Sequence, residues 1–165
     1  MSGIDMTHQG RLDRFLKEWE HDTYKSKSKL PEPTVCPECG AIYHKGRWQW
    51  SQTPVDADAH EHICPACARI QDQVPAGYLS LSGDFLEGHN EEILHLIRNI
   101  EEREKKEHAL KRIMNIEEQD KGMLVTFTDP HLAHEIGHAL HSAYKGELVH
   151  HYAEEDRTLR VDWSR

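Results

Sequence analysis

Cysteine is scarce in this sequence: only four occur in 165 residues, and all of them lie between positions 36 and 67. Long apolar runs are absent, and no stretch approaches the length that a membrane-spanning helix needs. The first residues, Met1 to Met6, have neither the basic start nor the apolar stretch of a secretory signal. We therefore expect a soluble, cytoplasmic protein without a membrane segment.

Positive charge is also in deficit, because 20 Lys and Arg residues stand against 29 Asp and Glu residues and the formal net charge is −9. This balance argues against a nucleic-acid-binding protein whose whole surface is basic. Residues 23–50 nevertheless hold more basic than acidic side chains, namely Lys25, Lys27, Lys29, Lys45 and Arg47 against Glu32 and Glu38. A local basic surface could contact phosphate there, and a solvated tail and loop are the alternative.

The cysteines form two Cys-x-x-Cys pairs, Cys36 with Cys39 and Cys64 with Cys67. Two such pairs can supply four thiolates to one tetrahedral Zn²⁺. Two disulfides, which need an oxidising compartment, or a redox-active pair are the alternatives. We predict one structural Zn²⁺ bound by all four cysteines, since four thiolates close the coordination and leave no catalytic position.

The composition predicts three parts: an N-terminal helix and flexible linker over residues 1–30, a zinc ribbon over residues 31–82 and an α+β domain over residues 83–165. In the first part, apolar residues recur at helical spacing over residues 7–21 and favour a short amphipathic helix. The stretch that follows, rich in Ser, Lys and Pro, is typical of an extended linker.

Within the ribbon, residues 41–43 and 47–50 favour a β-hairpin around a Gly turn. Trp48 and Trp50 lie on one face of the second strand, beside Lys45 and Arg47. These four residues could form a platform that stacks on unpaired RNA bases and contacts phosphates. The alternative is that both tryptophans fill the small core between the ribbon and the neighbouring domain.

The α+β domain begins with a helix from about residue 90, which carries isoleucines and a leucine on one stripe. Residues 110–118 and 123–128 predict two strands joined by a turn, and residues 148–153 and 157–163 predict a second hairpin. The resulting order of helix, hairpin, helix, hairpin predicts a small antiparallel sheet with packed helices.

The helix between the hairpins is predicted from its first residues, because Asp129 offers an N-cap and Pro130 suits the first helical position. This helix contains His134-Glu135-Ile136-Gly137-His138, which matches the His-Glu-x-x-His pattern of zinc metalloproteases. In that chemistry the two histidines bind Zn²⁺ and the glutamate acts as a general base. Candidate third ligands are His150, His151, Glu154 and Glu155.

Helical geometry bears on this motif, because His134, His138 and His141 lie on the side of the helix opposite its apolar stripe. We expect them to face solvent unless another element covers them. A plain polar helix face is therefore the favoured interpretation. A zinc-dependent hydrolase, or an exposed histidine patch that binds metal adventitiously, remains the alternative.

Three segments, residues 31–40, 43–48 and 75–79, resemble a family of small bacterial zinc-ribbon proteins of unknown function, and the resemblance extends from about Leu30 to Arg165. The layout of ribbon and α+β unit is similar to the N-terminal part of the archaeal and eukaryotic NMD-three adaptor. That adaptor binds large ribosomal subunits, so the resemblance implies a ribosome-related partner. The N-terminal part of the adaptor tends to carry more cysteines than this chain, so its ribosome contacts are not assigned to individual residues of this sequence.

Together these features predict a non-enzymatic, zinc-binding adaptor associated with RNA or the ribosome, with contacts at Lys45, Arg47, Trp48 and Trp50. One alternative is a zinc-dependent hydrolase that uses His134, Glu135 and His138. Another is a protein–protein interaction adaptor that uses the N-terminal helix and the acidic sheet. No membrane partner and no small-molecule substrate are expected.

Overall fold

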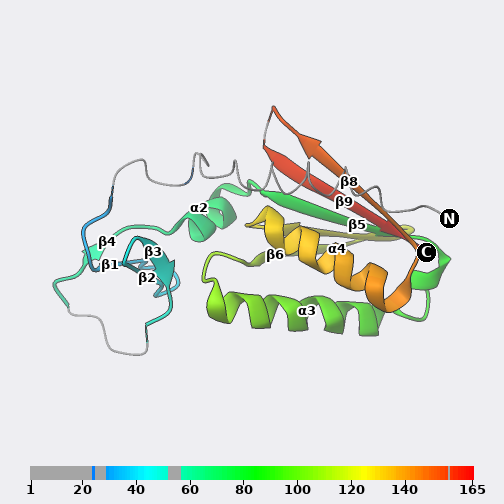
Figure 1. Ribbon diagram of the computed structural model, residues 1–165, viewed down its shortest axis with the longest axis horizontal. Coiled ribbons are helices and arrows are strands. Elements are labelled where there is room, and N and C mark those ends of the chain that lie inside the picture. Colours follow the sequence, from blue (N-terminus) through cyan, green and yellow to red (C-terminus); the bar gives the residue numbers. More distant parts are fainter. Residues whose placement is uncertain (1–23, 25–28, 52–56, 156) are drawn as a thin grey trace.

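The computed structural model describes residue 24 and residues 29–51, 57–155 and 157–165. The helix predicted over residues 7–21 lies outside the described residues. Figure 1 shows a small sheet at one end of the molecule, a larger sheet covered by two helices at the other, and a short helix between them. The predicted α+β class is confirmed. No helix in the described part of the chain combines the length and apolarity required to cross a bilayer.

The small sheet has the strand order β3-β2-β1-β4. Strands β2 (Ile42–His44) and β3 (Arg47–Gln49) form the expected hairpin, while β1 (Thr34–Val35) pairs antiparallel with β2 and parallel with β4 (His60–Glu61). Lys45 and Gly46 turn the hairpin with positive φ angles of 52° and 78°. The fully buried residues of the core beneath it have small side chains, and larger, partly exposed ones pack against them. The buried set is Cys36, Ala41, Cys64, Ala66, Cys67 and Ala109, and the partly exposed set includes Trp48, Trp50, Ile63 and Leu110. So little apolar surface cannot by itself hold such short strands together.

Helix α2 (Pro65–Asp72) follows the small sheet and has no counterpart among the predicted elements. Cys64 is its N-cap, with Sγ accepting a hydrogen bond from Cys67 N, and Pro65 occupies the first turn. The helix ends at Gln73, whose φ of 56° is left-handed. Eight residues are too few for a clear helical period in the sequence.

The large sheet has the strand order β6-β7-β5-β9-β8. The pairs β6 (Ile113–Gln119) with β7 (Gly122–Phe127), and β8 (Glu147–Ala153) with β9 (Thr158–Ser164), are antiparallel hairpins. Strand β5 (Gly77–Ser82) lies between the hairpins and pairs antiparallel with β7 but parallel with β9. The prediction of an antiparallel sheet is therefore wrong: the sheet is mixed, because the inserted strand runs in the same direction as β9.

Helices α3 (Asn90–Glu107) and α4 (Pro130–Tyr144) cover the same face of this sheet, as Figure 1 shows; a short 3₁₀ turn, Asp84–Leu86, precedes α3. At the start of α4, Asp129 Oδ1 accepts a hydrogen bond from His131 N at 2.7 Å, which is the expected cap. Alternate residues of the central strands meet apolar stripes of both helices. The core includes Leu79, Leu81, Ile93, Ile97, Val125, Phe127, Leu132, Ile136, Leu140, Val161 and Trp163.

Gly137 sets how closely α4 approaches the sheet, because a Cβ at this position would lie 2.7 Å from Val161 Cγ1 and 3.3 Å from Leu148 Cδ1. Gly137→Ala is expected to lower the free energy of unfolding by about 1–2 kcal/mol, since overpacking a stiff, buried valine outweighs the gain in helix propensity. Urea denaturation measures the change, with Ser142→Ala on the exposed side of α4 as the control. An unchanged midpoint for Gly137→Ala would contradict this account of the packing.

Candidate metal centre

The four cysteines come together between the small sheet and α2. Cys36 and Cys39 lie in the turn that joins β1 to β2, and Cys64 and Cys67 lie at the start of α2. Their Sγ atoms are all within 4.8 Å of one another, and Cys36, Cys64 and Cys67 are buried. The two Cys-x-x-Cys pairs therefore form one group that could hold a metal ion, as the sequence predicted.

The separation of the sulfurs fits a tetrahedral metal better than a disulfide. Cys39 Sγ and Cys64 Sγ are 3.8 Å apart. A tetrahedral zinc site with Zn–S bonds of about 2.3 Å has S···S edges of about 3.8 Å, whereas a disulfide brings its sulfurs to about 2.05 Å. All four thiols are free. The donor set, its spacing and its burial together match a closed four-thiolate site.

Backbone N–H groups surround the sulfurs and help to stabilise them as thiolates. Cys64 N donates to Cys36 Sγ at 3.3 Å, Cys67 N donates to Cys64 Sγ at 3.4 Å, and Ala41 N donates to Cys39 Sγ at 3.5 Å. Gly40, with a φ of 80°, allows the first turn to close. Hydrogen bonds of this kind are the outer shell that orients metal ligands and tunes their charge.

Arg112 is the functional residue that the sequence did not reveal. Its side chain is only 7% exposed, and its guanidinium donates to Cys67 Sγ and Cys39 Sγ, both at 3.1 Å, and more distantly to Cys64 Sγ at 3.6 Å. Arg112 directly precedes β6, so a residue of the α+β domain supplies the cation. A buried guanidinium without an anionic partner would be costly, and this one is placed to offset the charge of thiolates.

The backbone of Arg112 is fixed by the far end of the β6–β7 hairpin. Arg112 N donates to Thr128 Oγ1 at 2.9 Å, and Thr128 N donates to Arg112 O at 2.9 Å. Arg112 Nε also donates to Ala109 O at 3.0 Å. This set of hydrogen bonds connects the cysteine cluster to the large sheet.

The pKa values of the cysteines show why the cluster needs a cation. Burial raises the pKa of Cys64 and of Cys67, because it penalises the thiolate form. Burial also disfavours the Cys36 thiolate, but hydrogen bonds from the backbone N–H groups of Cys64, Cys39 and Glu38 lower the pKa of Cys36 to about 7. Four thiolates can coexist here when a divalent cation and Arg112 together offset their charge.

The four residues predicted to contact nucleic acid are placed in two different environments. Lys45 and Arg47 are exposed at the β2–β3 turn. Trp48 and Trp50 are partly buried and pack against the cysteine cluster. Trp50 Nε1 donates to Lys105 O at 2.7 Å, and the Arg112 Cζ atom lies 5.5 Å from the Trp50 ring centroid. The alternative interpretation of the sequence, in which the tryptophans fill the core between the ribbon and the neighbouring domain, therefore fits Trp50.

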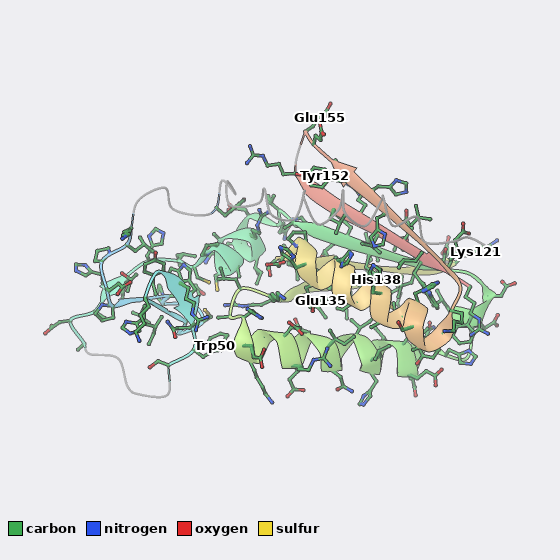
Figure 2. The ribbon with its side chains drawn as sticks, viewed as in Figure 1. Trp50, Lys121, Glu135, His138, Tyr152 and Glu155 are labelled. Atoms are coloured by element: carbon green, nitrogen blue, oxygen red, sulfur yellow. The ribbon has the colours of Figure 1, made fainter. Side chains whose placement is uncertain are left out.

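The His-Glu-x-x-His motif is divided between two sides of α4. Glu135 Oε1 accepts a hydrogen bond from Lys111 Nζ at 3.0 Å, and Lys111 Nζ also donates to Glu104 Oε2 at 3.2 Å. Burial disfavours the charge of Lys111, but the two carboxylates outweigh it and raise the Lys111 pKa. His134 and His138 instead lie beside His150 of β8. Glu135 is therefore bound to a residue that precedes the edge strand β6, whereas His150 lies on β8 at the opposite edge of the sheet. Figure 2 labels Glu135 and His138 on α4.

The motif histidines were expected to face solvent unless another element covered them, and in the structure β8 is that element. His134 and His138 are only partly exposed, because β8 covers this side of α4 and brings His150 against them. Burial, together with the neighbouring His138 and His150, lowers the pKa of His134 to about 4, so its imidazole is neutral at pH 7. His141, which was expected to join the other two, is not part of the cluster.

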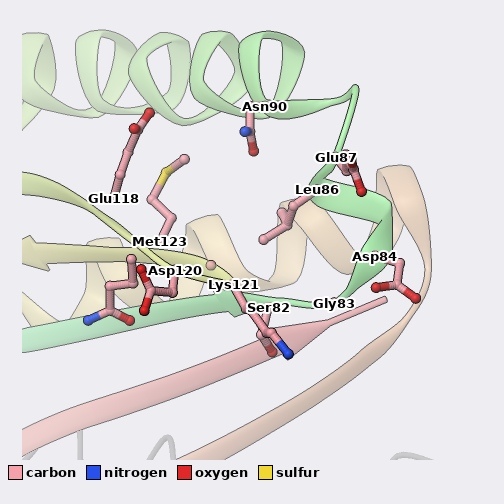
Figure 3. A pocket seen from close by; sticks show the side chains of 12 residues that line it. Ser82, Gly83, Asp84, Leu86, Glu87, Asn90, Glu118, Asp120, Lys121 and Met123 are labelled. Carbon is pink, nitrogen blue, oxygen red and sulfur yellow. The ribbon is translucent and has the colours of Figure 1, made fainter.

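A pocket of about 670 Å³ lies away from both clusters, near the start of α3 and the β6–β7 turn (Figure 3). Figure 2 places Lys121 of this pocket at the end of the molecule remote from Trp50. The rim of the pocket is mainly acidic, with Asp84, Glu87, Glu118 and Asp120 beside Lys121. None of the residues predicted from the sequence to bind metal or nucleic acid lines it.

Two features of the site could not be read as such from the sequence. Arg112 lies 45 residues beyond Cys67, and only the tertiary fold brings it to the sulfurs. His150 was one of four candidates for a third ligand, and of these it is the one that the structure places beside His134 and His138.

In comparisons with known proteins, no family model, no curated protein and no solved structure matches this chain.

Proposed function

We propose that this chain is a non-enzymatic zinc-binding protein in which the four-cysteine centre is a structural zinc ribbon. The observation that carries this proposal is the closed donor set: four thiols within 4.8 Å of one another, backbone N–H groups on the sulfurs and a buried guanidinium. Zinc is the metal most commonly bound by four thiolates in structural sites. Because all four coordination positions are taken by protein, this zinc has no position left for a substrate.

RNA, free or in the ribosome, is the partner that we propose for the small sheet. Its support is the resemblance to a ribosome-binding adaptor together with the exposed Lys45 and Arg47 at the hairpin turn. The turn is also well defined, since Glu32 Oε1 accepts a hydrogen bond from Gly46 N at 3.0 Å. Glu32 lowers the local positive charge, so the contact would rest on a few side chains, and its salt dependence would be shallow because the slope grows with the number of phosphates contacted.

The proposed contact surface is smaller than the set predicted from the sequence. Trp50 is bonded to Lys105 O and lies near Arg112, so it supports the hairpin from within. Trp48 is partly exposed and packs edge-on against Tyr43, with ring centroids 5.6 Å apart. Lys45 and Arg47 would bind phosphate, and the Trp48–Tyr43 pair would offer an aromatic face for a base.

Binding to labelled single-stranded RNA, measured by fluorescence anisotropy, and co-sedimentation with large ribosomal subunits test this proposal. The double variant Lys45→Glu with Arg47→Glu should weaken binding by at least about tenfold at low salt, because two phosphate contacts become repulsive. The matched control is Lys106→Glu with Lys121→Glu, which changes the net charge equally at exposed positions elsewhere. If both double variants weakened RNA binding equally, overall charge would explain the loss and a specific contact surface would be contradicted.

If neither RNA nor ribosomal subunits bind, the RNA partner is excluded while the structural zinc centre stands. Pull-down of a partner that survives nuclease treatment would then favour the protein–protein adaptor. The hydrolase alternative is weakened by the position of Glu135, whose carboxylate is bound to Lys111. In this structure the Glu135 carboxylate would have to leave Lys111 before it could act as a general base on a water molecule bound at His134 and His138.

A further inference from the structure

Three imidazoles from two elements meet between α4 and β8, apart from the cysteine centre. His134 and His138 are one helical turn apart on α4 and project from the same side. His150 lies on β8, on the face that also carries Leu148, which packs against the core. The ring centroids are 4.3 Å apart for His134 and His138, 5.1 Å for His134 and His150, and 5.2 Å for His138 and His150.

The nitrogens of these rings point into a common space. One ring nitrogen from each histidine lies within 4.8 Å of the other two, and the three Nε2 atoms are buried. His134 Nε2 has no hydrogen-bond partner among the residues that the structure describes. Since burying an imidazole nitrogen without a partner costs free energy, His134 Nε2 favours a ligand that accepts its lone pair, as a metal ion does.

We propose that His134, His138 and His150 bind a second metal ion, a divalent transition metal such as Zn²⁺, Co²⁺, Ni²⁺ or Cu²⁺. Neutral imidazoles suit these ions, whereas Mg²⁺ and Ca²⁺ prefer oxygen ligands. A tetrahedral site with Zn–N bonds of about 2.0–2.1 Å needs its nitrogens about 3.3 Å apart. The three ring nitrogens already lie within 4.8 Å of one another, so each would have to move by little to reach that distance.

This site differs in chemistry from both the cysteine centre and a His-Glu-x-x-His protease. Three protein ligands leave one coordination position open to water or to a small anion. The carboxylate of the motif's glutamate is bound to Lys111 in this structure. The metal would join α4 to the edge strand β8, so its binding would also stabilise this edge of the sheet.

Metal analysis of the intact protein, with any affinity tag removed and after dialysis against a weak chelator, tests the site. The parent should retain about two equivalents of Zn²⁺, one at each cluster, and His150→Ala should retain about one. His151→Ala is the matched control: His151 is the next residue of β8, is exposed on the opposite face and lies 3.4 Å from Asp162, so it should retain both equivalents. Equal metal content in the parent and His150→Ala would overturn the proposal, and so would an equal loss in His151→Ala.

Replacement of zinc by Co²⁺ separates the two sites spectroscopically. The cysteine centre should give intense thiolate-to-metal charge-transfer bands, and the second equivalent should add only weak d–d bands of a nitrogen-ligated ion. Cys64→Ser should remove the first signal and keep the second, so failure of the ribbon and failure of the histidine site are distinguishable. If His150→Ala does not fold, NMR of the histidine rings in the parent tests the site instead. If a second equivalent of metal leaves the ring resonances of His134, His138 and His150 unshifted, the proposal is contradicted.

Discussion

Replacing Cys64 with serine is expected to abolish tight zinc binding at the four-cysteine centre and to unfold the small sheet while the large sheet stays folded. Serine is itself a favourable N-cap, so the start of α2 keeps its cap and the loss isolates the metal. Structural zinc sites contribute about 10–16 kcal/mol of apparent binding free energy. Strands of two or three residues over a core of cysteines and alanines are otherwise held mainly by partly exposed side chains such as Trp48 and Trp50.

Amide hydrogen exchange measures this outcome residue by residue. Protection should be lost at Cys36 N, which donates to Ala41 O at 2.8 Å, and at His62 N, which donates to Val35 O at 3.0 Å. Protection in β5, β7 and β9 should persist, because their core contains no cysteine. Glu38→Gln, an exposed change within the first Cys-x-x-Cys pair, is the control. Retained zinc and unchanged exchange in Cys64→Ser would show that three thiolates suffice and that the sheet does not depend on the metal.

Replacing Arg112 with methionine is expected to weaken zinc binding by about tenfold to a hundredfold, which corresponds to about 1.4–2.8 kcal/mol. Methionine keeps much of the buried stem but removes the two N–H···S bonds of 3.1 Å and the positive charge. Arg112→Lys should recover only part of the affinity, because an ammonium restores the charge but not the fork that reaches two sulfurs. Competition with a chromogenic zinc chelator measures these differences.

The control for Arg112 is Arg103→Met, which removes the same charge from an arginine whose side chain is 71% exposed on α3. If Arg112→Met and Arg103→Met gave the same affinity as the parent, the guanidinium would be a packing residue with no effect on the metal. If Arg112→Lys matched the parent in full, charge alone would explain the role and the bidentate geometry would be irrelevant. The expected order of affinity is therefore parent, then lysine, then methionine.

Local signals in the sequence located the cysteine group, the β2–β3 hairpin and the start of α4, because each depends on residues close together in the chain. The N-cap Asp129 and the following Pro130 define the start of α4 without any knowledge of its neighbours. The same was true of the strands in the two hairpins of the large sheet, whose partners are adjacent in sequence. Short-range chemistry was sufficient for these parts.

Tertiary contacts decided what the sequence could not. The histidines of α4 were expected to face solvent, since nothing in a helical projection shows that the edge strand β8 will cover them. Arg112 reads as an ordinary cation beside Lys111, yet one is buried against sulfur and the other is bound to two carboxylates. The order of strands was also out of reach, because the sequence does not state that β5 separates the two hairpins.

The parallel pairing of β5 with β9 has a consequence for how the chain folds as it is synthesised. Strand β5 is made before α3, α4 and both hairpins, but one of its two partners, β9, is the last strand of the chain to be made. Until then β5 can pair only with β7, and the β9 side of the strand remains an open edge with unpaired backbone groups. Such a long-range pairing raises the contact order and delays closure of the core. A nascent chain arrested before Thr158 would therefore lack an inner strand of the sheet and expose Leu79 and Leu81, the buried face of β5, to aggregation.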